Sequence, residues 1–210
     1  MALPSTSGLP ALYRRLTTGP AFIQARYGTA RGLGRLLLAE GSRRIGRFRD
    51  FEKIDWRAVR RLVFVCSGNI CRSPYAEARA RALGYRAASF ALRGDAGLPA
   101  DAAALAAAKR RDLDLGAHRA TNRAGFAVKA GDIMIGMEPW QGEALRALVS
   151  NSGCQVTLLG LWSRPRRAHL HDPHTLSPRY FDTCFTSIDS AVQAIAALAQ
   201  HAATETAHAP

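Results

Sequence analysis

Residues 62–74 read LVFVCSGNICRSP, and they set the expected architecture. Leu62–Val65 is a purely apolar run of the kind that forms a buried strand of a parallel sheet. The run ends at Cys66. Ser73 and Pro74 then supply a helix N-cap and a proline at the first helical position. Strand, short loop and helix start follow one another directly, which predicts the first unit of an α/β fold.

Downstream of this unit, short apolar runs alternate with helical patterns, as in a parallel α/β sheet. We predict a four-stranded parallel sheet flanked by helices, in a domain over 59–203 with a flexible tail at 204–210. The expected strands are 62–65, 86–91, 132–137 and 156–159, and the expected helices are 73–83, 100–111, 139–149 and one that starts at Ser177-Pro178.

The charge balance is strongly basic, with 29 Lys+Arg against 16 Asp+Glu in 210 residues. Residues 1–60 carry 12 of the basic and 4 of the acidic side chains, so the excess is concentrated there. Gly and Pro interrupt residues 1–58, and we expect a basic, partly ordered extension with no stable helix before about Gly34. An organellar transit peptide is the minor interpretation. A short basic amphipathic helix within 36–51 would allow peripheral contact with an anionic membrane.

Composition also restricts the class of protein. A hydrophobic share of 48% with 21% charged residues is typical of a folded soluble domain. No apolar run approaches the roughly 18–20 residues of a membrane span. Four unevenly spaced cysteines are too few for a disulfide framework, which favours a reduced, cytoplasmic setting. Because most of the excess charge lies in the extension, we expect no nucleic-acid partner.

The loop from Cys66 to Arg72 is predicted to bind an oxyanion. Backbone N–H groups of such a loop and the positive end of the next helix converge on one point. The same dipoles favour a thiolate at Cys66, and a thiolate in a phosphate cradle is a nucleophile aimed at phosphorus. Arg72 can bind two phosphoryl oxygens at once. Gly68 and Asn69 allow the loop to turn its amides inward.

Cys66 to Pro74, followed by Ala76-Glu77, closely resembles the signature of the low-molecular-weight protein tyrosine phosphatases of bacterial type. Further similarity brings the resemblance to about residues 61–200, in segments 97–101, 116–120, 132–137 and 171–173. The resemblance implies a flavodoxin-like topology (phosphotyrosine phosphatase I-like), no cofactor, a phosphotyrosine protein substrate and a phospho-cysteine intermediate.

The resemblance also assigns roles, with Asp172 of Asp172-Pro173 as general acid and later general base. His174 stands in the cleft wall where bacterial relatives usually carry an aromatic residue, and Cys71 can trap oxidised Cys66 as a reversible disulfide. The implied catalytic residues are Cys66, Arg72 and Asp172; the phosphate loop comprises Ser67, Gly68, Asn69, Ile70, Cys71, Arg72 and Ser73; and the supporting network comprises Asn69, Glu77, His118 and Ser89.

Two other functions share some of these features. Thiol-dependent arsenate reductases have the same fold but need a second pair of cysteines some seventy residues beyond the loop, and 138–148 contains none. A catalytically weak adaptor docked by its basic leader is the other alternative. We expect no metal site, because His169, His171 and His174 lack partner ligands at suitable sequence spacing. The resemblance further suggests a membrane tyrosine autokinase of polysaccharide export as the substrate.

Overall fold

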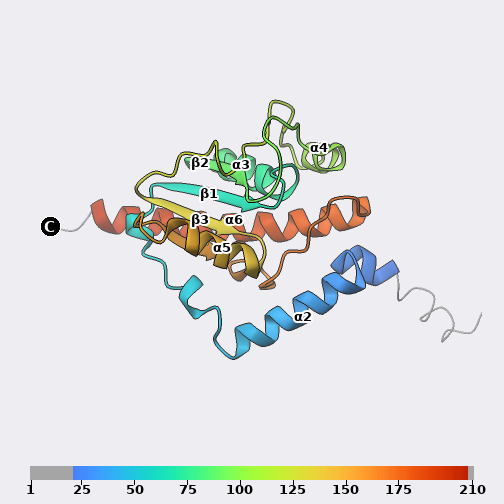
Figure 1. Ribbon diagram of the computed structural model, residues 1–210, viewed down its shortest axis with the longest axis horizontal. Helices are drawn as coiled ribbons and strands as arrows, with labels where there is room; N and C mark the ends of the chain where they lie inside the picture. The colour runs from blue at the N-terminus through green and yellow to red at the C-terminus, as the bar shows by residue number, and fades with distance from the viewer. Residues whose placement is uncertain (1–20, 208–210) are drawn as a thin grey trace, which may run out of the picture.

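The computed structural model describes residues 21–207, which form a parallel sheet with helices on both faces (Figure 1). Residues 21–27 are helical, and the remaining elements follow in chain order. These are α2 (Ala30–Arg44), the 3₁₀ helices η2 (Arg49–Phe51) and η3 (Trp56–Ala58), β1 (Arg61–Cys66), α3 (Arg72–Ala82), β2 (Ala87–Ala91), α4 (Ala102–Lys109), β3 (Asp132–Gly136), α5 (Pro139–Val149), β4 (Gln155–Leu158), η4 (Leu159–Leu161) and α6 (Pro178–Ala207).

The four strands are all parallel and lie in the order β2-β1-β3-β4. This confirms the predicted sheet. Each predicted strand agrees with an observed one to within two residues at either end, and the helix predicted over 139–149 has those bounds in the structure. The order reverses between β1 and β3, and ligands of open parallel sheets bind at the carboxyl ends of the strands beside such a reversal.

Two hydrophobic clusters cover the two faces of the sheet. On one face, Leu62 and Phe64 pack with side chains of α3, α4 and α6. On the other, Val63 and Val65 pack with α5 and with Phe51 from the segment that precedes β1. Because alternate residues of a strand point to opposite faces, the apolar run 62–65 supplies both clusters.

The amino-terminal segment is more ordered than the sequence indicates. We expected no stable helix before Gly34, but α2 already begins at Ala30, where the Thr29 side chain accepts a hydrogen bond from the Gly32 amide at 2.9 Å. Thr29 is therefore an N-cap that compensates for the poor helix propensity of the glycines in α2. The helix ends at Arg44, so the expected amphipathic helix covers only the first part of 36–51.

Residues before the domain boundary that we expected at residue 58 pack against the domain that follows it. Phe48 and Phe51, which lie in the segment 36–51 where we expected an amphipathic helix, are 7% and 0% exposed. Phe51 packs in the second cluster, its carbonyl accepts a hydrogen bond from Thr157 of β4 at 2.6 Å, and Arg146 of α5 lies over its ring. This stretch is thus part of the core under the sheet.

At the other end, α6 continues to Ala207, beyond residue 203 where we ended the domain. Glu205 forms an ion pair with Arg57 at 2.8 Å. The start of the predicted flexible tail is therefore helical up to residue 207. Among the described helices, none is both long and apolar enough to span a membrane.

Replacing Phe51 by alanine should reduce the free energy of unfolding by about 3–5 kcal/mol, because it opens a cavity between α5 and the sheet. Phe22→Ala is the matched control, since Phe22 lies in the same amino-terminal segment but is 59% exposed and should cost less than about 0.5 kcal/mol. Urea unfolding of the full chain measures both. A loss below about 1 kcal/mol for Phe51→Ala would show that the segment is not part of the core.

Candidate active site

Cys66 is the last residue of β1, at the point where the strand order reverses. Its sulfur lies 3.0 Å from the hydroxyl oxygen of Ser73 and accepts a hydrogen bond from the backbone N–H of Asn69 at 3.2 Å. The residue is only 3% exposed. The sulfur is thus held in place by a hydroxyl and an amide of the loop and of the helix start.

Asn69 holds the loop in shape. It has a φ of 54°, the left-handed conformation that asparagine tolerates, as expected. Its side-chain amide nitrogen donates to Ser73 at 2.9 Å and to Ser89 at 2.7 Å. Ser89 in turn donates to Glu77 at 2.6 Å, and His118 Nε2 lies 2.7 Å from the Asn69 carbonyl oxygen. The structure brings the four predicted network residues together around this loop.

Gly68 and Ser73 behave differently from the prediction. Gly68 does not take a positive φ, and an added Cβ would meet only Ile70 at ordinary contact distance. Glycine is needed more at Gly94, which has a φ of 133° and approaches Gly68 closely. Helix α3 begins at Arg72 with Cys71 as its N-cap residue, so the Ser73 hydroxyl serves the sulfur and Asn69 rather than the helix end.

Arg72 is completely buried and joins three segments. Its Nη1 donates to Glu138 and to the Leu170 carbonyl, both at 2.8 Å, and its Nη2 donates to Asp172 at 2.6 Å. Nε is buried and has no partner among the described residues. An unpaired charged donor is costly to bury, so this atom indicates that an anionic ligand completes the site.

Neighbouring anions keep this guanidinium charged. Burial alone would lower the pKa of Arg72. The charges of Asp172, Cys66 and Glu138 outweigh burial, and the pKa lies above its ordinary value. The site therefore holds a permanent positive charge at the carboxyl end of the sheet.

Asp172 faces the site from the segment that precedes α6. One carboxylate oxygen accepts from Arg72, and the other accepts from the backbone N–H of His174 at 3.2 Å. The side chain is 38% exposed, so it can exchange protons with solvent. Asp172 and Cys66 are 106 positions apart in the chain, and the fold brings both to Arg72.

The amino-terminal segment packs against the same acid segment. Thr29 Oγ1 lies 3.2 Å from His171 Nε2, next to Asp172 in the chain. A Cβ at Gly32 would come within 2.7 Å of the His171 ring, so glycine permits this close approach. Burial lowers the pKa of His171. Residues well outside the resemblance thus support the loop that carries the expected acid.

The remaining loop residues contact neighbouring segments of the chain. The Ile70 carbonyl accepts from the Asp101 backbone N–H at 2.9 Å, and Ser67 receives a long contact of 3.4 Å from Gln141. Cys71 is 2% exposed, and burial is the main cause that raises the pKa of its thiol. Its trapping of oxidised Cys66 stays a prediction. His174 is exposed and lies 3.4 Å from Asp101.

Glu138 is the main site residue that the sequence interpretation missed. It is 4% exposed, follows β3 and forms a capping box with Gln141 at the start of α5. Besides Arg72, its carboxylate accepts from the indole nitrogen of Trp140 at 3.2 Å. The sequence does contain a signal for this residue. Glu138 is a carboxylate that follows a buried strand at the sheet reversal and precedes a proline that starts a helix.

Glu138→Ala should cost about 3–5 kcal/mol of stability and weaken binding of inorganic phosphate, because it leaves the buried Arg72 charge without its buried counter-ion. Glu143→Ala on the exposed side of the same helix is the matched control and should change neither quantity. Urea unfolding and calorimetric phosphate titration measure the two effects. Unchanged phosphate affinity in a folded Glu138→Ala protein would contradict the role of Glu138 in orienting Arg72.

Comparison with known proteins agrees with this geometry. The family described as "Low molecular weight phosphotyrosine protein phosphatase" matches residues 61–205. A relative from Ralstonia solanacearum, the probable low molecular weight protein-tyrosine-phosphatase EpsP, is 28% identical over 65% of this chain and 93% of its own length. The low molecular weight protein-tyrosine-phosphatase Wzb of Salmonella typhi is 30% identical over 61% of this chain and 87% of its own.

A solved structure, Vibrio vulnificus Wzb in complex with benzylphosphonate, is 28% identical and superposes with a TM-score of 0.57 over 65% of this chain and 97% of its own. The family match spans the sheet, the phosphate loop and the acid segment, and leaves out the amino-terminal segment. This chain belongs to the low molecular weight phosphotyrosine protein phosphatase family.

Proposed function

We propose that this enzyme hydrolyses phosphotyrosine in proteins with Cys66 as nucleophile, Arg72 as phosphoryl ligand and Asp172 as proton donor and acceptor. The observation that carries the assignment is the meeting of a hydrogen-bonded cysteine sulfur, a buried arginine with an unpaired Nε and a half-exposed carboxylate at one loop. Phosphoryl transfer needs these three functions: a nucleophile, charge stabilisation and an acid.

In the first step the Cys66 thiolate attacks phosphorus, the bond from phosphorus to the tyrosine oxygen breaks, and Asp172 gives that oxygen its proton. In the second step water attacks phosphorus, Asp172 takes a proton from the water, and the bond from sulfur to phosphorus breaks. The products are tyrosine, inorganic phosphate and free enzyme. The loop amides and Arg72 hold the phosphoryl oxygens in both steps.

Arg72 changes partners when phosphate enters. In the described state its Nη2 is held by Asp172. A phosphoryl group above Cys66 would take the free Nε and share Nη2, while Nη1 stays with Glu138 and the Leu170 carbonyl. Asp172 is then released to reach the leaving oxygen.

Among the described residues, no contact supports the arsenate reductase alternative. Cys154 directly precedes β4 and donates to the Lys129 carbonyl, and Cys184 is buried in the core, where burial raises the pKa of its thiol to about 12. Neither thiol is poised to relay a disulfide, which an arsenate reductase requires.

Cys66→Ser should lower the hydrolysis rate of a phosphotyrosine peptide at least about a thousandfold, because serine is a far weaker nucleophile. Asp172→Asn should lower kcat about 10²–10⁴-fold on the same peptide and much less on an aryl phosphate whose phenol is a good leaving group. Asp182→Asn, at an exposed ion pair with Arg110, is the control and should keep full activity. An equal loss on both substrates for Asp172→Asn would refute its role as general acid.

We further propose that the substrate is a membrane tyrosine autokinase of polysaccharide export and that the enzyme works in the cytoplasm. Support comes from the family resemblance, from similarity to a phosphatase that binds benzylphosphonate, a phosphonate with an aromatic ring, and from four free cysteines, all in the described part of the chain.

The exposed side of α2 supports contact with an anionic membrane. Leu37, Leu38 and Ile45 are 63%, 75% and 76% exposed, and Arg44 and Arg47 are exposed beside them. Apolar side chains among arginines are typical of helices that lie on anionic lipid surfaces. It covers only part of the segment 36–51 expected from the sequence, because Phe48 and Phe51 are buried.

Sedimentation with phosphatidylserine vesicles should bring down the full chain, and phosphatidylcholine vesicles should do so much less. Leu38→Glu should weaken the binding at least about tenfold, since it removes an inserted apolar group and adds a repelled charge. Leu83→Glu, at the exposed end of α3, is the control and should bind like the unchanged protein. Equal binding of both variants would rule out this surface of α2.

A further inference from the structure

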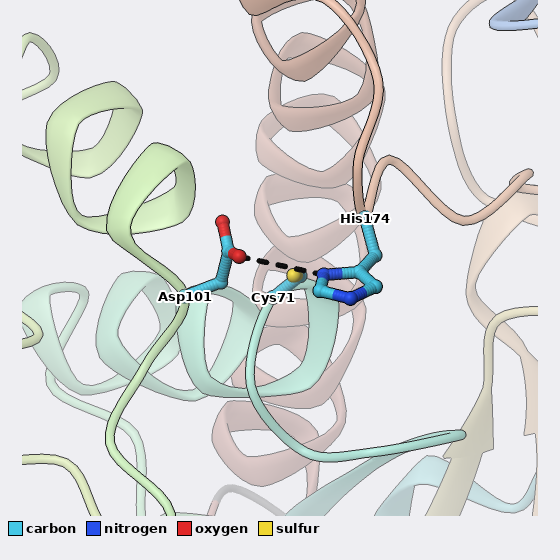
Figure 2. A group of neighbouring side chains, drawn as sticks. All are labelled: Cys71, Asp101 and His174. Atoms are coloured by element: carbon cyan, nitrogen blue, oxygen red, sulfur yellow. Dashed lines mark ion pairs between the residues drawn. The ribbon is translucent and has the colours of Figure 1, made fainter.

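Three side chains that no role in catalysis explains meet beside the phosphate loop. Cys71 comes from the loop before α3, Asp101 from the N-cap of α4 and His174 from the segment before α6 (Figure 2). One ligand atom from each, a sulfur, a carboxylate oxygen and an imidazole nitrogen, lies within 4.8 Å of the other two. Figure 2 shows the sulfur beside the line that joins Asp101 and His174.

The three groups are free to bind a ligand. Oδ1 of Asp101 accepts both cap hydrogen bonds, from the amides of Ala103 and Ala104, so that Oδ2 is left to face His174 at 3.4 Å. The Cys71 sulfur has no hydrogen-bond partner within residues 21–207. His174 is half exposed, so an ion can reach the group from solvent and the ring can move toward it.

We propose that Cys71, Asp101 and His174 form a Zn²⁺ site at the edge of the phosphate loop. A thiolate, an imidazole and a carboxylate are all ligands that Zn²⁺ accepts, and three protein ligands leave a fourth position for water. The thiolate disfavours Mg²⁺ and Ca²⁺, which prefer oxygen. Ligand atoms around a tetrahedral Zn²⁺ lie about 3–4 Å apart, so closure needs a movement of roughly 1 Å by the exposed His174.

Binding forms a zinc–sulfur bond while the Cys71 proton leaves to water, with no change of oxidation state. The ion then joins the phosphate loop to the acid segment, because the His174 amide is bonded to Asp172. On the proposed function, this fixes Asp172 at the loop and restrains Arg72 from changing partners, so Zn²⁺ inhibits hydrolysis reversibly.

Cobalt is the spectroscopic probe for this site. The full chain with Cys66→Ser, which removes the nucleophile as a ligand, should bind one Co²⁺ with a near-ultraviolet charge-transfer band from a thiolate, and one Zn²⁺ should displace it. Adding Cys71→Ser should abolish the band. Asp101→Asn and His174→Asn should each weaken binding at least about tenfold, since loss of even an outer partner of a metal ligand costs that much. Asparagine keeps the cap at position 101.

Cys154→Ser and His201→Asn are matched controls, because Cys154 is a solvent-accessible thiol and His201 an exposed histidine away from the loop. Both should leave the cobalt band and the affinity unchanged. A band that survives Cys71→Ser, or equal weakening by His174→Asn and His201→Asn, would overturn the site, as would the absence of saturable binding. If circular dichroism shows that Cys71→Ser is unfolded, the affinities of Asp101→Asn and His174→Asn for Co²⁺ decide whether the site exists.

Inhibition is tested separately with Cys66 intact. Zn²⁺ should inhibit hydrolysis of an aryl phosphate, a chelator should reverse it, and His174→Asn should raise the inhibitory Zn²⁺ concentration at least about tenfold. Equal inhibition of His174→Asn would mean that Zn²⁺ acts on Cys66 and would refute the regulatory role. An unchanged chain that hydrolyses no aryl phosphate would refute the proposed function, while the cobalt titration would still decide the metal site.

Discussion

The buried charge of Arg72 organises the site. A guanidinium removed from water must be paired, and here the partners come from two other segments: Glu138 follows β3, and the Leu170 carbonyl and Asp172 lie before α6. The hydrogen bonds of the Arg72 side chain thus hold the phosphate loop next to two distant parts of the chain. The Arg72 Nε has no partner among the described residues, and on the proposed function the phosphoryl group of a substrate accepts its hydrogen bond.

The amino-terminal segment belongs to the same body as the phosphatase domain, although the family match begins only at residue 61. Phe51 fills the core under the sheet, and Thr29 and Gly32 pack on His171, beside the expected acid. Glu40 extends this contact by accepting from the Ala168 backbone at 2.9 Å. The segment therefore supports the loop on which catalysis relies while it turns Leu37 and Leu38 to solvent.

The fold was predictable because its signals are local. An apolar run such as Leu62–Val65 can only be buried, and a proline such as Pro139 marks where a helix begins. The helical structure of the amino-terminal segment could not be predicted from such local signals. Glycine lowers helix propensity in isolation, but Gly32 is favoured here because a side chain would collide with His171, 139 positions away. The sequence placed a carboxylate at Glu138 after a buried strand, but it did not show the pairing with Arg72, because the two residues lie 66 positions apart.

The amino-acid sequence alone defined the strand–loop–helix unit with Cys66 and Arg72, since spacing within one short loop is a local property. Through the family resemblance it also pointed to Asp172. Only the tertiary structure showed that Arg72 binds Glu138, that the basic segment supports the acid loop, and that Cys71 and Asp101 meet His174. The spacing of histidines along the chain predicted no metal site, because ligands from three separate segments become neighbours only after the sheet and its helices have packed.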